Sequence, residues 1–88
     1  MKARYLEVTY RKGKPLAAYL YLPREPGVKS VRTERATDRI LVDFDDGNRP
    51  MGLEITDPDG VTVDEINRVL QRLGQVQIAP EELAPFAA

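Results

Sequence analysis

The feature that most constrains the fold is a pair of alternating segments on either side of a Gly-Asn dipeptide. Residues 40–45 and 50–56 carry apolar side chains at every second position, the spacing of a half-buried β-strand. A two-residue Gly47-Asn48 loop matches short hairpin connections and places apolar residues opposite apolar residues. The pairs predicted by this loop are Asp46–Arg49, Phe44–Met51, Val42–Leu53 and Ile40–Ile55. The side chains predicted on the opposite face are Leu41, Asp43 and Asp45.

A second hairpin is predicted nearer the N-terminus. Residues 5–11 alternate, residues 16–22 are rich in Tyr and Leu, and Gly13-Lys14-Pro15 separates them. A loop with an odd number of residues gathers the apolar side chains on one face, whereas an even loop scatters them, so we expect an odd loop. The gathered face then holds Leu6, Val8, Tyr10, Ala18, Leu20 and Leu22. The other face holds Tyr5, Glu7, Thr9, Tyr19 and Tyr21.

The remaining elements are a charged strand and a helix. Residues 28–36 alternate weakly and carry several charges, which is typical of an edge strand. Thr62 and Glu65 have the spacing of a capping box, in which each side chain binds the other residue's backbone amide, and Gly74 suits a C-cap. One helical stripe between them comprises Val63, Ile66, Val69, Leu70 and Leu73. We also expect an extended piece at 76–78, then one helical turn over 80–84, with Leu83 and Phe86 docked on an apolar surface.

The predicted fold class is α+β. We expect an antiparallel sheet of about five strands, made of two hairpins plus an edge strand, covered on one face by a C-terminal helix near residues 62–74. A chain of 88 residues forms one domain with a thin core. Residues 1–78 are predicted to form this single domain, and residues 79–88 a partly ordered C-terminal tail.

The composition excludes most catalytic and metal chemistry. The chain contains no Cys and no His, which removes thiolate and imidazole nucleophiles, bases and metal ligands. A calcium loop that begins at Asp43 and ends at Glu54 would need Gly at its sixth position, where this chain has Asn48. We therefore expect no enzyme activity, no catalytic residue, no metal site and no cofactor. The acidic residues that could hold a cation do not fit this calcium-loop pattern: Asp43, Asp45, Asp46, Glu54, Asp57 and Asp59.

Charge is unevenly distributed along the chain. Through Arg39 there are ten Lys and Arg against four Asp and Glu; from Ile40 onward there are three against ten. The net charge of −1 argues against nucleic-acid binding, whereas the asymmetry suits self-association or a partner of complementary charge. No apolar run is long enough for a signal peptide or a membrane span, so we expect a cytoplasmic protein without membrane contact.

Four segments resemble a family of short prokaryotic β-rich proteins catalogued as a domain of unknown function. Its members run from a tyrosine-rich strand through an Asp-rich hairpin to a closing "v-G-I-E-I" strand. The matching segments, which lie within residues 16–57, are Tyr19-Leu20-Tyr21-Leu22, Val31-Arg32-Thr33, Ile40-Leu41-Val42-Asp43-Phe44-Asp45 and Met51-Gly52-Leu53-Glu54-Ile55. The resemblance implies no active site; it implies an antitoxin-like protein, because some members are suspected partners of small toxins. The basic segment 11–14 and the capped helix after residue 57 depart from the family pattern.

These observations together predict a protein-interaction domain. Tyr5, Tyr19 and Tyr21 share the face that one helix leaves uncovered, and tyrosine is enriched at protein interfaces. We therefore expect them to be partner-contact residues of a homodimer, since association is the form of stabilisation that remains without disulfides or metals. The alternatives are an antitoxin-like protein that binds a small partner protein and a carboxylate-based metal-binding or hydrolytic site.

Overall fold

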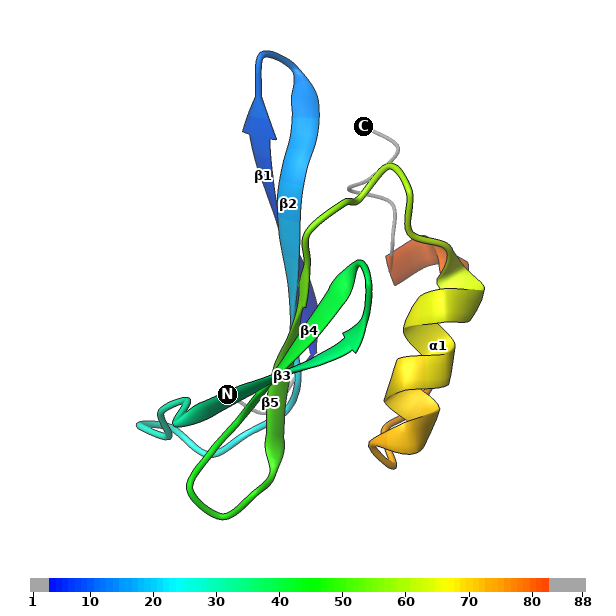
Figure 1. Ribbon diagram of the computed structural model, residues 1–88. Coiled ribbons are helices and arrows are strands. Elements are labelled where there is room, and N and C mark those ends of the chain that lie inside the picture. The colour runs from blue at the N-terminus through cyan, green and yellow to red at the C-terminus, as the bar shows by residue number, and fades with distance from the viewer. Residues whose placement is uncertain (1–3, 83–88) are drawn as a thin grey trace.

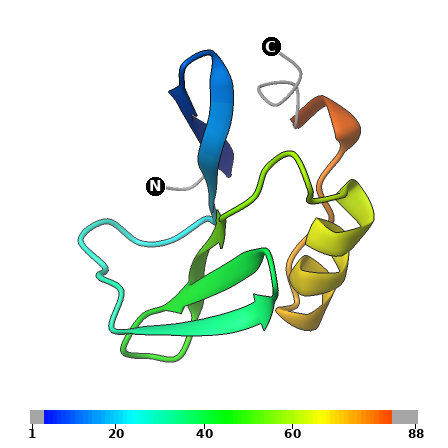
Figure 2. The ribbon, with the colours of Figure 1, turned by 45° about the horizontal axis from the view of Figure 1, so that its top comes forward.

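Five strands form one antiparallel sheet, and a helix lies against one of its faces (Figures 1 and 2). The structure is a computed structural model that describes residues 4–82. The α+β class and the coverage of one sheet face by a C-terminal helix are confirmed. The elements in chain order are β1 (Tyr5–Arg11), β2 (Lys14–Tyr21), β3 (Arg32–Thr37), β4 (Ile40–Phe44), β5 (Pro50–Ile55) and α1 (Val63–Arg72).

The strand order is β1-β2-β5-β4-β3, so the two hairpins meet along β2 and β5. Ala18 lies opposite Ile55 and Leu20 opposite Leu53, which makes one continuous apolar surface from two locally formed units. The charged third strand lies at the far edge of the sheet, as predicted, although it starts at Arg32 rather than at residue 28.

The face assignment of the first hairpin is confirmed except at Tyr10, which was predicted to face the core and is 42% exposed, and the loop is not odd. Leu6 pairs with Leu20 and Tyr5 with Tyr21, as the alternation requires. The loop is the two-residue turn Lys12-Gly13, with φ values of 53° and 78°, the positive pair typical of a type I′ hairpin. The pairing changes register between Thr9 and Tyr10: Thr9 lies opposite Ala17 and Tyr10 opposite Pro15, so one residue of β2 has no partner. This bulge has the same effect on the two faces as one more residue in the loop, and it keeps the apolar side chains of both strands on one face.

The second hairpin has the predicted register in its body and a different turn. Ile40 pairs with Ile55 and Val42 with Leu53, but Phe44 lies opposite Pro50 instead of Met51. Asp45, predicted to face away from the core, is only 5% exposed and organises the turn. Its Oδ1 accepts hydrogen bonds from the amides of Gly47 (2.8 Å) and Arg49 (2.9 Å), so the connection is wider than the two-residue loop that hydrophobic pairing suggested.

Helix α1 covers the inner sheet face and has only half of the predicted capping box. The Thr62 hydroxyl accepts from the Glu65 amide at 3.1 Å. The Glu65 carboxylate does not return to Thr62; it accepts from the Thr37 hydroxyl at 2.6 Å and ties α1 to the β3–β4 turn. Gly74 (φ 72°) ends the helix as predicted. The buried core is Ala18, Leu20, Leu22, Ile40, Val42, Leu53, Ile55, Ile66, Val69, Leu70 and Ile78.

The segment after α1 is held by two polar side chains that the sequence pattern did not single out. The Asn67 side chain accepts from the Ile78 amide (2.6 Å) and donates to the Ile78 carbonyl (3.4 Å). Arg4, whose side chain is 13% exposed, donates to the carbonyl of Gln77 (3.1 Å) and pairs with Glu82 (3.0 Å). A 3₁₀ turn occupies residues 80–82; Leu83 and Phe86 lie outside the described residues.

Replacing Asn67 with Ala should remove the two hydrogen bonds that its side chain makes to the backbone of Ile78. We expect a loss of about 1–3 kcal/mol of unfolding free energy, because a buried backbone amide loses its partner. Hydrogen exchange should show faster exchange at the Ile78 amide, while Gln71→Ala, at an exposed position of the same helix, should leave it unchanged. Equal Ile78 exchange in both variants would contradict this reading.

Candidate contact surface

Three tyrosines form a cluster on the sheet face opposite α1. The rings of Tyr5 and Tyr21 stack with centroids 4.5 Å apart and planes inclined by 17°. The rings of Tyr19 and Tyr21 meet edge to face at 4.6 Å and 62°. The structure thus brings together all three residues that the sequence singled out. We call this surface the tyrosine face: Tyr5, Tyr19 and Tyr21 with the outward-facing residues that they contact, Glu7, Asp43 and Gly52.

Tyr21 is fixed at the centre of the tyrosine face. Its hydroxyl donates to Glu7 Oε1 at 3.1 Å, and the Arg24 guanidinium lies over its ring, 5.1 Å from the centroid. Burial is the main cause that raises the pKa of Tyr21 above its usual value, and the hydrogen bond to Glu7 adds to it. Tyr5 stacks on this ordered ring but remains 48% exposed. The cluster therefore presents an accessible ring on an immobilised support.

Tyr19 crosses the junction between the two hairpins. Its ring lies directly over Gly52, where an added Cβ would come within 2.3 Å of the ring carbon Cε2. Its hydroxyl donates to Asp43 Oδ2 at 2.7 Å, and the Thr33 hydroxyl donates to Asp43 Oδ1 at 2.5 Å. Burial first, and then the bond to Asp43, raise the pKa of Tyr19 well above its usual value. The phenol therefore stays protonated at neutral pH and acts as a hydrogen-bond donor.

The contacts of Tyr19 were not evident from the sequence. Alternation placed Asp43 on the outward face, and that part of the prediction is confirmed by its contact with Tyr19. Which tyrosine it meets depends on β2 lying beside β5, a pairing between segments that no local pattern specifies. The available signal was Gly52 within an otherwise apolar strand, because glycine in a strand often marks the close approach of another group.

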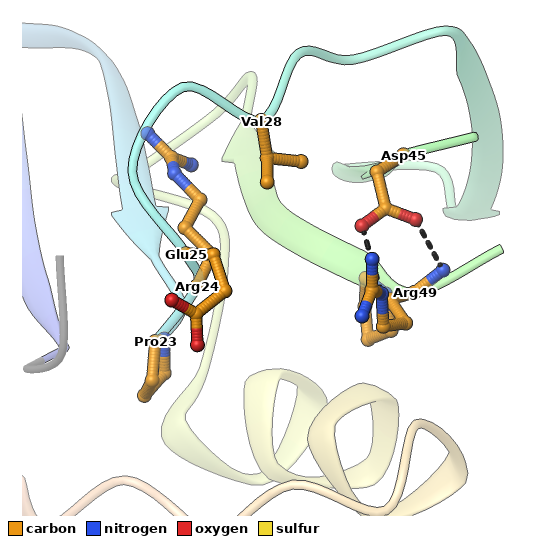
Figure 3. A pocket seen from close by; sticks show the side chains of 7 residues that line it. Pro23, Arg24, Glu25, Val28, Asp45 and Arg49 are labelled. Atoms are coloured by element: carbon orange, nitrogen blue, oxygen red, sulfur yellow. Dashed lines mark hydrogen bonds and ion pairs between the residues drawn. The ribbon is translucent and has the colours of Figure 1, made fainter. Parts of the chain in front are cut away.

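A pocket of about 280 Å³ lies beside the β4–β5 turn, between this turn and the segment that follows β2 (Figure 3). Asp45 and Arg49 face each other there, with Oδ2 and Nε 3.0 Å apart. Hydrogen bonding by the Arg49 backbone, more than the neighbouring guanidinium, lowers the pKa of Asp45. Arg24 donates to the Met51 carbonyl at 3.2 Å. The polar groups of this pocket thus hold the chain itself in place.

The acidic residues that could hold a cation make separate contacts within the fold. Asp43 accepts from two hydroxyls, Asp45 organises its turn, and Asp57 accepts from the Gly60 amide at 3.2 Å and faces Arg39 Nε at 3.6 Å. Within residues 4–82, no three carboxylates gather in an arrangement that could hold a metal ion. In the same part of the chain, no helix has the length and apolar character needed to cross a membrane.

Gly52→Ala should destabilise the protein by about 1–3 kcal/mol, because the methyl group displaces the Tyr19 ring and strains its bond to Asp43. Urea unfolding measures the change. In a Tyr19→Leu background, which removes the ring, the same substitution should cost clearly less. An equal cost in both backgrounds would show that the ring is not the cause.

Asp45→Asn should change how stability depends on pH. The folded-state pKa of Asp45 is lowered, so its ionised form stabilises the fold above the ordinary carboxyl pKa near 4, and this contribution disappears as pH falls through the folded value. We expect wild type to be more stable than Asp45→Asn at pH 7, with the difference shrinking below about pH 4. Glu82, whose pKa is also lowered, is present in both proteins and cancels. A difference that is constant from pH 7 to pH 2 would refute the assignment.

Comparison with protein-family models, curated proteins and solved structures yields no match to this chain. The geometry of the tyrosine face, rather than any relative, is therefore the basis for a functional proposal.

Proposed function

We propose that this chain is a non-enzymatic protein-interaction domain that acts as a homodimer and uses the tyrosine face as its contact surface. The observation that carries the proposal is the half-exposed Tyr5 ring stacked on Tyr21, on the sheet face that α1 leaves uncovered. An outward sheet face normally alternates to polar side chains. Aromatic rings in their place supply the contact area that interfaces favour.

The order of the rings supports this proposal energetically. Binding costs free energy when side chains must be immobilised, about 0.5–1.5 kcal/mol for each rotamer-rich side chain. Tyr21 is already held by Glu7 and by the Tyr5 ring, and Tyr19 by Asp43. These side chains would therefore lose little further freedom in a complex, and tyrosine combines large area with few rotatable bonds.

The chemistry of the face supports a binding function over a catalytic one. The chain lacks His and Cys, so the tyrosines and carboxylates would have to act as the reactive groups. Tyr19 is kept protonated by burial and by Asp43, and Asp43 already accepts from two hydroxyls. Each group is thus engaged by the fold and serves to order the surface.

A second candidate is the capture of a small basic partner protein, the antitoxin-like role that the family resemblance implies. The observation in its favour is that carboxylates beside the rings outnumber the Arg24 guanidinium that lies over Tyr21. Glu7 and Asp43 contact the tyrosines, and Glu54 pairs with Tyr19 across the β2–β5 junction. Carboxylates around aromatic rings favour a positively charged partner and would speed its encounter.

Sedimentation equilibrium tests the first candidate. Wild type should dimerise, and Tyr5→Thr with Tyr21→Thr should raise the dissociation constant at least about tenfold, since central interface tyrosines commonly contribute more than 1 kcal/mol. Threonine keeps the strand preference of both positions. Leu16→Thr, which removes a side chain of similar exposure (50%) near the hairpin tip, should change nothing. A wild type that stays monomeric at millimolar concentration, or equal effects of the two changes, would reject the tyrosine face as the dimer contact.

A further inference from the structure

The sheet has two edges, β1 and β3, and β3 is the better protected of the two. An edge strand offers a row of backbone donors and acceptors to any other strand, and proteins usually block it with charges, bulges or prolines. Strand β3 is blocked in this way. Arg32 pairs with Glu34 along it, Arg35 donates to the carbonyls of Thr37 and Asp38, and a bulge interrupts its pairing after Arg35.

Strand β1 carries charges only at Glu7 and Arg11, on its outward face, and has neither a bulge nor a proline. It spans seven residues, contains no proline, and stays regular throughout because the bulge lies in β2. Its inward side chains include Leu6 and Val8, which pack against the core, and it carries no inward charge. Within residues 4–82, β1, like β3, has a neighbouring strand on one side only. A long, regular edge with apolar inward residues is the type that recruits a further strand.

We propose that β1 pairs antiparallel with β1 of a second copy around a two-fold axis at Val8, so that both sheets join into one. This inference rests on the self-association in the proposed function and names a strand and a register for it, with Tyr5 as the residue of the tyrosine face that meets the second copy. The second copy is the partner favoured here because the strand is complementary to itself. A two-fold axis perpendicular to the sheet keeps both tyrosine faces on one side and both helices on the other.

The side chains select this register from the symmetric alternatives. With the axis at Val8, all seven residues of β1 pair: Val8 with itself, Leu6 with Tyr10, Glu7 with Thr9 and Tyr5 with Arg11. Apolar residues then meet on the inner face, and a guanidinium meets an aromatic ring on the outer face. An axis at Glu7 would oppose two carboxylates, which is destabilising. An axis at Thr9 would leave Tyr5 and Leu6 beyond the end of the partner strand.

This arrangement would also extend the tyrosine face. Tyr5 lies on the pairing strand and stacks on Tyr21, so the two clusters would flank the two-fold axis. Arg4 would come opposite Lys12 of the second copy. This juxtaposition of two cations is tolerable because Glu82 pairs with Arg4 at 3.0 Å.

Single cysteines test the register directly, since the chain has none of its own. At the two-fold position the Cα atoms of Val8→Cys would be about 4.5–5.5 Å apart, within the range of a disulfide. For Glu7→Cys or Thr9→Cys, two residues of offset give about 8 Å, beyond that range. Mild oxidation should therefore convert most Val8→Cys into a covalent dimer on a non-reducing gel, with at least about tenfold less from the other two. Preferential cross-linking of Thr9→Cys, or equal and slow cross-linking of all three, would overturn the proposal.

A charge at the edge gives an independent check. Val8→Lys would place two ammonium groups opposite each other at the axis and should raise the dimer dissociation constant at least about tenfold. Glu34→Lys, an added positive charge on the other edge strand, should leave it unchanged. Circular dichroism establishes that both variants are folded. A folded Val8→Lys that dimerises as tightly as wild type would also overturn the proposal.

The two proposals fail in different ways. A dimer that is weakened by the tyrosine changes but gives no Val8→Cys cross-link retains the tyrosine face as the contact and rejects edge pairing. A dimer that cross-links at Val8 but ignores the tyrosine changes retains edge pairing and rejects the face. A chain that is monomeric at every concentration rejects both.

Discussion

The pairing of β2 with β5 is the contact on which the rest of the structure depends. Each hairpin can form from neighbouring residues, but neither alone offers a surface wide enough to bury a helix. When Leu20 lies beside Leu53, the two apolar faces become one, and α1 has a continuous surface to cover. The same pairing acts on the opposite face, where it places Gly52 under the Tyr19 ring and Asp43 within its reach. One junction therefore creates both the core and the tyrosine face.

Local sequence patterns predicted the strands and the helix of this fold. The details that they did not predict are set by side-chain hydrogen bonds. The alternation in Ile40–Phe44 predicted its inward residues, and the apolar spacing after Thr62 predicted the helix. The turn after β4 was not predicted correctly, because hydrogen bonds from nearby amides to the Asp45 carboxylate, and not hydrophobic pairing, set its register. Such side-chain hydrogen bonds leave no periodic pattern in the sequence. The second half of the capping box failed for a similar reason: a tertiary partner, Thr37, takes the Glu65 carboxylate.

The sequence predicted which sheet face carries the three tyrosines, but not how each ring is held or how exposed it is. Parity alone put Tyr5, Tyr19 and Tyr21 on one face, since a one-residue slip would have exposed the core side instead. What parity cannot supply is the difference between them. Tyr19 is half-buried and fastens the hairpins together, whereas Tyr5 is exposed at the edge strand. The face thus runs from the structural ring of Tyr19, through Tyr21, to the accessible ring of Tyr5, which lies on the edge strand of the sheet.

The clamp formed by Arg4 has a consequence for the topology of the chain. Its guanidinium joins the start of β1 to Glu82 and to the Gln77 carbonyl, so the two ends of the described chain are neighbours in space. A linker that joins these two ends could therefore close the backbone into a ring without changing the order of the strands. The exposed connection between β2 and β3, around Pro26-Gly27, would supply the new ends, and a circularly permuted chain would retain every strand pair of the parent.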